Sequence, residues 1–151
     1  MTLATALATG IADDLLSGAL ASLAYAGVGA AVLAVGYAAL DALTPGRLRH
    51  LVYEHRNANA AVVVIANLLA LATIVTTAIA TSDDELGRGL ADAAVYGGLG
   101  IVLLALCFRL VDALTPGDLG ALVTDERPHP AAWVTAVAQL ALGAVLAAAI
   151  S

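Results

Sequence analysis

Long apolar segments alternate with short polar ones along this chain. Each of the four apolar segments carries almost no charge and exceeds the roughly 20 residues that a helix needs to cross about 30 Å of hydrocarbon. They are Ser17–Leu40, Ala58–Thr81, Leu90–Val111 and Ala131–Ser151. None has the polar face of a helix on the surface of a soluble protein. The pattern predicts an all-α polytopic membrane protein, with four transmembrane helices in a single membrane domain over residues 1–151.

The composition narrows the range of partners and activities. Hydrophobic residues make up 62% of the chain and charged residues 12%, about half the roughly 25% of an ordinary soluble domain. The lipid bilayer is the expected partner, and no nucleic acid is expected. No serine, cysteine or histidine stands in a nucleophilic arrangement, and His50, Glu54 and His55 lack the spacing of a zinc protease. We therefore expect no enzyme activity, no metal and no cofactor.

The hexapeptide Asp-Ala-Leu-Thr-Pro-Gly occurs twice, 71 residues apart. The same shift places Tyr25–Ala34 on Tyr96–Ala105, with agreement at tyrosine and glycine positions. Agreement at Tyr, Gly, Asp, Thr, Pro and Arg in one register is difficult to obtain by chance in an alanine-rich sequence. The chain is therefore predicted to contain two copies of a helical hairpin, approximately 17–81 and 90–151. Because each copy crosses twice, the copies are parallel repeats.

The repeated hexapeptide predicts a bend, here called the elbow motif. Its threonines are expected to be N-cap residues, with each proline at the first position of a following helix. Proline also disfavours helix at the residue before it, which ends the preceding spans near Leu43 and Leu114. A short amphipathic helix at the membrane interface should follow each elbow. The motif residues are Asp41, Thr44, Pro45 and Gly46 in the first copy, and Asp112, Thr115, Pro116 and Gly117 in the second.

The two motif aspartates lie in the last turn of a helix, where the negative end of the helix dipole disfavours a carboxylate. Arg109, three residues before Asp112, can pair with that residue along the helix. Asp41 has no equivalent arginine. Two interpretations are open: the aspartates hold the elbow through hydrogen bonds to the turn, or they bind a cation or a proton at the mouth of a pathway.

The arginines predict the orientation. With four spans, the elbow side carries five arginines and the opposite side one. The positive-inside rule then places both elbows in the cytoplasm and both termini outside. This arrangement suits a multi-pass protein of the plasma (inner) membrane of a prokaryote.

These residues resemble a known family. The duplicated elbow, followed in the first copy by Asn57–Ala66 (Asn-Ala-Asn-Ala-Ala-Val-Val-Val-Ile-Ala), is similar to the YjfL-like membrane proteins, catalogued as domain of unknown function 350. The resemblance implies a small four-span inner-membrane protein without an agreed activity, associated in some genomes with phage-shock-type envelope-stress modules. Asn57 or Asn59 carries over with the elbow motif. The second copy departs from the pattern, because Pro128-His129-Pro130 replaces the asparagines.

The second span carries a stripe of small and polar side chains. At 100° per residue, Asn59, Thr73 and Thr77 share one face with two alanines. Such a stripe indicates either close helix packing or the lining of a polar pathway. Asn67 lies off the stripe near mid-span, and Gln139 lies at a similar depth in the fourth span, so an amide–amide hydrogen bond between them is expected. Arg109 is expected to reach the interface as an anchor or to act in selectivity.

Glycines in the first and third spans allow helix backbones to approach closely, between copies or between subunits. They are Gly27, Gly29, Gly98 and Gly100. The chain is expected to assemble as a homo-oligomer. Two functions then compete: an ion-conducting or small-solute assembly, and a structural or sensory component of an envelope-stress module with a cytoplasmic partner.

Overall fold

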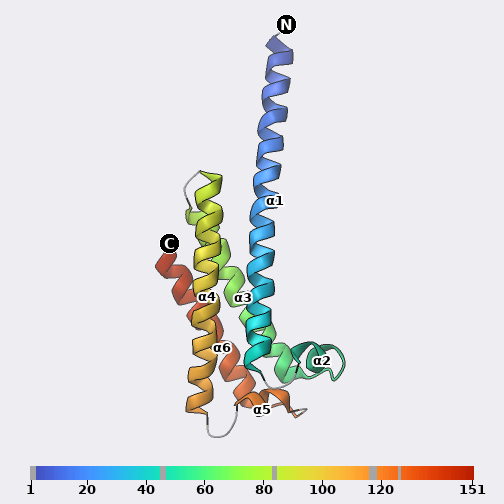
Figure 1. The fold of residues 1–151 in the computed structure, drawn as a ribbon, viewed down its shortest axis with the longest axis vertical. Coiled ribbons are helices and arrows are strands. Elements are labelled where there is room, and N and C mark those ends of the chain that lie inside the picture. The colour runs from blue at the N-terminus through green and yellow to red at the C-terminus, as the bar shows by residue number, and fades with distance from the viewer. Residues whose placement is uncertain (1–2, 45–46, 83–84, 116–118, 126) are drawn as a thin grey trace.

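A computed structural model describes residues 3–44, 47–82, 85–115, 119–125 and 127–151. Six helices account for most of them, and the described residues include no strand (Figure 1). They are α1 (Leu3–Leu43), α2 (Leu48–Tyr53), α3 (Ala58–Thr81), α4 (Leu86–Leu114), α5 (Leu119–Thr124) and α6 (Pro130–Ile150). Helices α1, α3, α4 and α6 each contain a stretch that is long and apolar enough to cross a membrane. The prediction of an all-α protein with four spans is confirmed.

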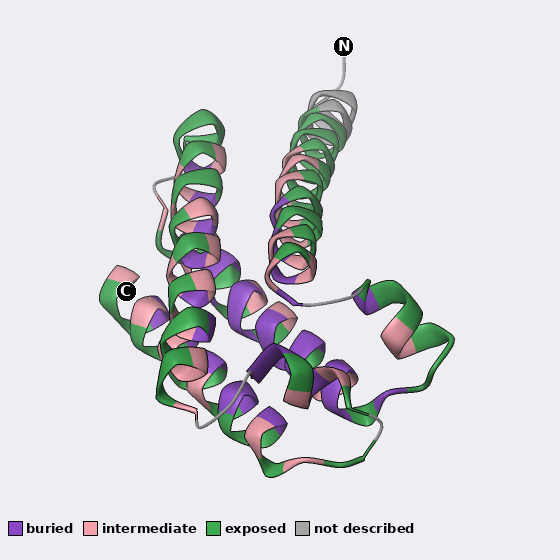
Figure 2. Cartoon of the chain, turned by 60° about the horizontal axis from the view of Figure 1, so that its bottom comes forward, coloured by how far each residue is buried: buried purple, intermediate pink, exposed green. Residues whose placement is uncertain are grey.

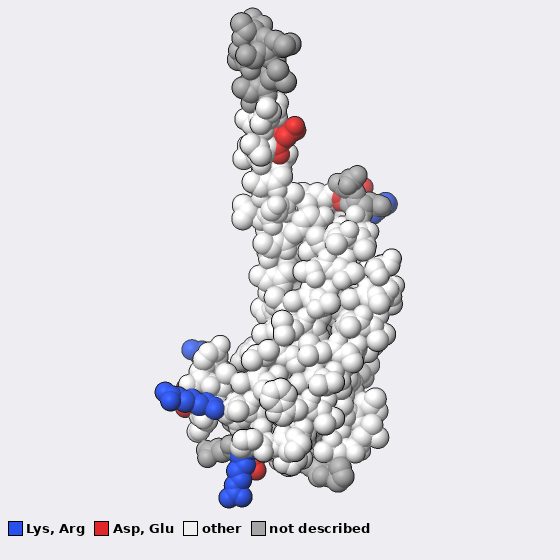
Figure 3. Space-filling view, turned by 180° about the vertical axis from the view of Figure 1, so that it is seen from behind, with Lys and Arg blue, Asp and Glu red and all other residues white. Residues whose placement is uncertain are grey.

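The four long helices form one bundle with both short helices at the same end. Helices α1 and α4 run toward this elbow end and α3 and α6 run back from it (Figure 1). Helices α1 and α4 end at Leu43 and Leu114, as the prolines that follow them predict. In Figure 3 a broad belt of uncharged surface separates the charged side chains of the elbow end from those nearer the opposite end of the molecule. This belt is the layer expected to lie in hydrocarbon.

Helix α1 is much longer than the sequence pattern indicated. It begins at Leu3 rather than Ser17, and its 41 residues correspond to about 60 Å, roughly twice the thickness of the hydrocarbon layer. Residues 3–16 are rich in alanine and leucine, which favour helix, and contain no proline. Two neighbouring aspartates ended the predicted span, but they do not end the helix.

Helix α3 is the centre of the bundle and α1 lies at its margin. About half of the most apolar stretch of α3 is buried, against 6% of that of α1 (Figure 2). At the elbow end, both short helices insert into the same apolar cluster, where Leu48 of α2 and Leu119 of α5 join Val63 and Phe108. The spans and the elbows therefore share one core.

Of the four glycines predicted to pack, Gly100 does so most closely. A Cβ added there would lie 2.9 Å from the Ile74 side chain, and one at Gly29 would only touch Val75 at 3.8 Å. A Cβ at Gly27 or Gly98 would meet no neighbouring atom within 4 Å. Close packing inside the protomer is therefore absent at Gly27 and Gly98.

Four other glycines make tight contacts, and one of them, Gly89, lies against the Tyr25 side chain. Gly36 and Gly97 accommodate the side chains of Leu71 and Val32, and Gly143 of α6 lies directly against Ala70 of α3. A Cβ at Gly143 would lie 2.9 Å from the Ala70 Cα, so a backbone rather than a flexible side chain stands in the way. Gly143 therefore sets how closely α6 approaches the central helix.

The packing at Gly143 gives a first prediction. Gly143→Ala is expected to destabilise the protein by about 1–3 kcal/mol, because the methyl group overpacks a contact with backbone. Thermal unfolding in detergent measures the change. Gly98→Ala is the matched control and should unfold at the wild-type temperature or slightly above it, since alanine favours helix and the position is open. Equal effects of the two substitutions would contradict this account of the α3–α6 contact.

Candidate functional site: the elbow end

The first elbow is closed by two hydrogen bonds from its motif residues. Asp41 Oδ1 accepts from the backbone N–H of Leu48 at 2.6 Å, at the first residue of α2. Thr44 Oγ1 donates to the carbonyl of Leu40 at 3.0 Å, at the end of α1. The carboxylate thus satisfies an N–H at a helix N-terminus, where the helix itself provides no partner. The hydroxyl adds a second donor to the Leu40 carbonyl, which also accepts from the Thr44 N–H at 3.1 Å.

The second elbow repeats this arrangement at positions 71 residues later. Asp112 Oδ1 accepts from the N–H of Leu119 at 2.9 Å, and Thr115 Oγ1 donates to the carbonyl of Val111 at 2.7 Å. These are the hydrogen bonds to the turn that the structural interpretation of the aspartates required. Pro45, Gly46, Pro116 and Gly117 lie outside the described residues.

Two predictions for the elbows are wrong. Thr44 and Thr115 are not N-caps, because each hydroxyl donates backward to the helix that ends there. The first short helix begins only at Leu48, after Arg47, and the aspartate reaches across to its N-terminus instead. The expected Arg109–Asp112 pair also does not form: both residues are described, and no ion pair joins them. Arg109 is exposed on α4, and the Asp112 carboxylate is already used by the turn.

Two buried asparagines of the first hairpin hold the second elbow. Asn57 Nδ2 donates to the carbonyls of Thr124 at 2.9 Å and Asp125 at 2.8 Å, while its Oδ1 accepts from the N–H of Ala60 and caps α3. Asn57 therefore fixes the start of α3 and the end of α5 together. We call Asn57 and Asn59 the asparagine clamp.

Asn59 makes more hydrogen bonds to the second elbow than Asn57 does. Its Nδ2 donates to the carbonyls of Arg127 at 2.8 Å and Asp125 at 3.1 Å, with Leu122 at the limit of 3.5 Å. Its Oδ1 accepts from the N–H of His129 at 3.0 Å. The segment between α5 and α6 therefore uses both the donor and the acceptor side of the amide. The Asn59 side chain is thus buried, at 3% exposure, against the backbone of the second elbow.

The rest of the small and polar stripe on α3 divides along the helix. Ala66 and Ala70 are buried with Asn59, whereas Thr73 is exposed and Thr77 is half-buried. Thr73 Oγ1 donates to the carbonyl of Leu69 at 2.8 Å, and Thr77 Oγ1 donates to that of Thr73 at 2.9 Å. Each threonine thus bonds its own helix, which lets it face lipid at little cost.

The two mid-span amides do not bond each other. Gln139 is fully buried and Asn67 is 4% exposed, yet both side-chain polar atoms of Gln139 and the Oδ1 of Asn67 have no hydrogen-bond partner. The prediction of an Asn67–Gln139 hydrogen bond is therefore wrong. A cavity of about 10 Å³ beside Asn67, also lined by Gly36 and Leu104, is close to the size of one water molecule.

The histidines show no sign of a metal centre. His50 Nδ1 lies 2.9 Å from Glu54 Oε1 on the exposed side of α2. His129 Nδ1 accepts from the N–H of Ala131 and caps α6. In the part of the chain that the structure describes, no three His, Cys, Asp or Glu side chains converge as metal ligands.

The comparisons with known proteins give a consistent result. Residues 14–150 match the family described as Domain of Unknown Function (DUF350). A "UPF0719 transmembrane protein" of Mycolicibacterium paratuberculosis is 43% identical over the full length of both chains. UPF0719 transmembrane proteins of Mycobacterium bovis and Mycobacterium tuberculosis are each 39% identical, over 91% of this chain and 90% of theirs. No solved structure matches.

The asparagine clamp gives a second prediction. Asn59→Leu leaves the part-buried Arg127 carbonyl and His129 N–H without this partner, and is expected to destabilise the protein by about 1–3 kcal/mol. Thermal unfolding should show this loss, and hydrogen exchange of residues 122–129 should accelerate. Thr73→Ala, in the same helix but exposed, is the control and should leave both measurements unchanged. Wild-type exchange of residues 122–129 in Asn59→Leu would show that the clamp is not needed.

The unpaired amide of Gln139 gives a third prediction. Gln139→Leu replaces it with an apolar group of similar size and is expected to stabilise the protein by about 1–3 kcal/mol, because nothing offsets the burial of the amide. Thermal unfolding in detergent again provides the measurement. A clear drop in the unfolding temperature would mean that Gln139 has a partner in the membrane.

Proposed function

We propose a function for this chain, which belongs to the DUF350 family of transmembrane proteins. It is a non-enzymatic structural component of the bacterial plasma membrane, and it assembles with copies of itself. In this proposal the elbow end faces the cytoplasm, in accordance with its arginines, and both termini face outward. The elbow end is then the surface at which a cytoplasmic envelope-stress partner would bind.

The observation that carries this proposal is the uncovered apolar surface of α1. Large apolar side chains point outward along the first half of this helix. They are Ile11, Leu15, Leu16, Leu20 and Leu23. The groove between α1 and α3, lined by Gly29 and Ala72 among others, has a volume of about 380 Å³, and the groove between α1 and α4 about 360 Å³. Small residues along such grooves favour the close approach of another helix.

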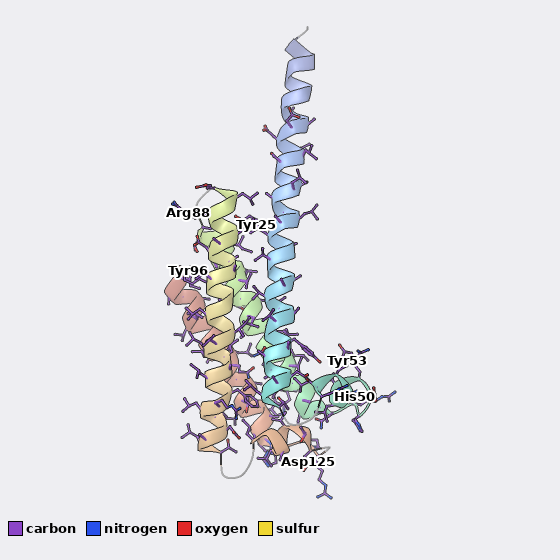
Figure 4. All side chains as sticks on the ribbon, in the orientation of Figure 1. Tyr25, His50, Tyr53, Arg88, Tyr96 and Asp125 are labelled. Atoms are coloured by element: carbon purple, nitrogen blue, oxygen red, sulfur yellow. The ribbon has the colours of Figure 1, made fainter. Side chains whose placement is uncertain are left out.

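Helix α1 is too long for lipid alone to cover all of its exposed apolar side chains. The Tyr25 side chain lies against Gly89 near the start of α4, at the end of the bundle away from the elbows (Figure 4). The part of α1 before Tyr25 extends past this level by about 33 Å, at 1.5 Å per residue. Leucines that lie outside the hydrocarbon layer are exposed to water, and exposing an apolar side chain to water costs free energy. A second copy of α1 would cover them.

Transport through the interior of one protomer is the weaker proposal. The asparagine clamp is occupied by backbone, Asn67 and Gln139 are enclosed, and Thr73 and Thr77 bond their own helix. Asp41 and Asp112 are each bonded to a helix N-terminus. A conducting path would therefore have to run between subunits, which again requires assembly.

Disulfide cross-linking tests the assembly. In a Cys107→Ala background, Leu16→Cys is expected to give a disulfide-linked dimer in oxidised membranes, because copies of α1 lie side by side. Val134→Cys, on the exposed face of α6, is the control and should remain monomeric. Absence of the Leu16→Cys dimer, or equal cross-linking at Val134→Cys, would exclude an interface along α1.

A further inference from the structure

A short segment at the first elbow has a surface charge unlike the rest of the chain. We call residues 47–56 the α2 arm. It contains three arginines, two histidines and a single glutamate. All six of these side chains are exposed, and Figure 3 shows basic side chains gathered at one side of the elbow end. Basic charge is thus concentrated next to the end of a membrane span.

The one acidic group of the arm already has a partner within it. Glu54 Oε1 lies 2.9 Å from His50 Nδ1. Arg47, Arg49 and Arg56 form no ion pair with any residue that the structure describes. Their guanidinium groups can therefore bind an anion from outside the protomer.

The arm is fixed to the bundle on one side only. Leu48 is fully buried, Asp41 bonds its N–H, and Leu51 and Val52 are half-buried against the core. Tyr53 is 77% exposed, and Figure 4 shows the arm projecting sideways from the foot of α1. An exposed tyrosine beside arginines at the end of a span is typical of the interface between lipid headgroups and water.

The second elbow provides an internal reference. Residues 118–127 align with the α2 arm at the 71-residue shift, but hold three acidic residues and one arginine. With histidine neutral, the arm has a net charge of +2 and its counterpart −2. The counterpart helix α5 also buries more of itself, at Leu119, Gly120 and Val123. The arm is therefore basic, with one fully buried residue in its helix, and its counterpart is acidic, with three buried residues in its helix.

We propose that the α2 arm binds the headgroups of anionic phospholipids. Guanidinium groups match phosphate oxygens in geometry and charge. Headgroups lie at the level of the arm because α1 leaves the hydrocarbon immediately before it, whereas an acidic protein would have to be recruited there. Binding requires only that the chain spans a membrane, so it is independent of self-assembly through α1.

Native mass spectrometry of the full-length protein released from nanodiscs tests the proposal. The nanodiscs contain equal amounts of phosphatidylglycerol and phosphatidylcholine, and the measured quantity is the ratio of their adducts. An arginine near an anionic surface is worth about 1 kcal/mol, or roughly fivefold. Wild-type protein should favour phosphatidylglycerol, Arg49→Gln should lower the ratio about fivefold at most, and the triple variant R47Q/R49Q/R56Q should bring it close to one. Added salt should lower the wild-type ratio.

Arg127→Gln is the matched control, because Arg127 occupies the position of Arg56 in the acidic elbow. It should retain the wild-type ratio. Thermal unfolding verifies that each variant is folded, and Arg49→Gln alone decides the matter if the triple variant is not. An equal drop in Arg127→Gln, or a wild-type ratio near one, would overturn the proposal. In the second case, the charge of the arm would be assigned to an acidic protein partner.

Discussion

Hydrogen bonds from side chains to backbone at the elbow end are the interaction on which this structure depends. A helix end has unpaired N–H and C=O groups, and beside hydrocarbon these groups find few partners in solvent. Asp41 and Asp112 satisfy the N-termini of α2 and α5, and the asparagine clamp satisfies the loop after α5. These bonds determine where two spans end and how the two hairpins meet.

The side chains of the clamp belong to the first hairpin, and they bond backbone groups of the second. Pro128 and Pro130 lack an N–H, so the Pro-His-Pro segment has one backbone donor, that of His129, and Asn59 accepts from it. The carbonyls before this segment accept from the two asparagine amides. Asparagines in one copy and prolines in the other are therefore complementary. The residues that stand in place of the asparagines 71 positions later are thus part of the contact between α3 and the segment before α6.

The sequence was sufficient for the features that depend on local physics. Apolar length gave the four spans, and proline gave the ends of α1 and α4 at Leu43 and Leu114. Features that depend on a partner distant in the chain were not accessible. The Asn59 amide is used by residues 63 to 70 positions away, and the Gly143 contact with Ala70 depends on the crossing of two helices. Periodicity alone could not separate Gly98, which is open, from Gly97, which is packed.

A polar residue in a span does not by itself indicate a polar surface. The α3 threonines satisfy their hydroxyl hydrogens within their own helix, and the clamp is filled by backbone. Most of the polar side chains of α3 are thus satisfied by their own helix or by the backbone of the second elbow. The surfaces that the fold uses least are the outward face of the first half of α1, with its uncovered leucines, and the exposed face of the α2 arm, with its unpaired arginines. An exposed apolar patch costs free energy in water, and such patches are where contacts with other molecules are expected. Both surfaces belong to the first half of the chain, whereas α6 of the second half packs against the central helix α3.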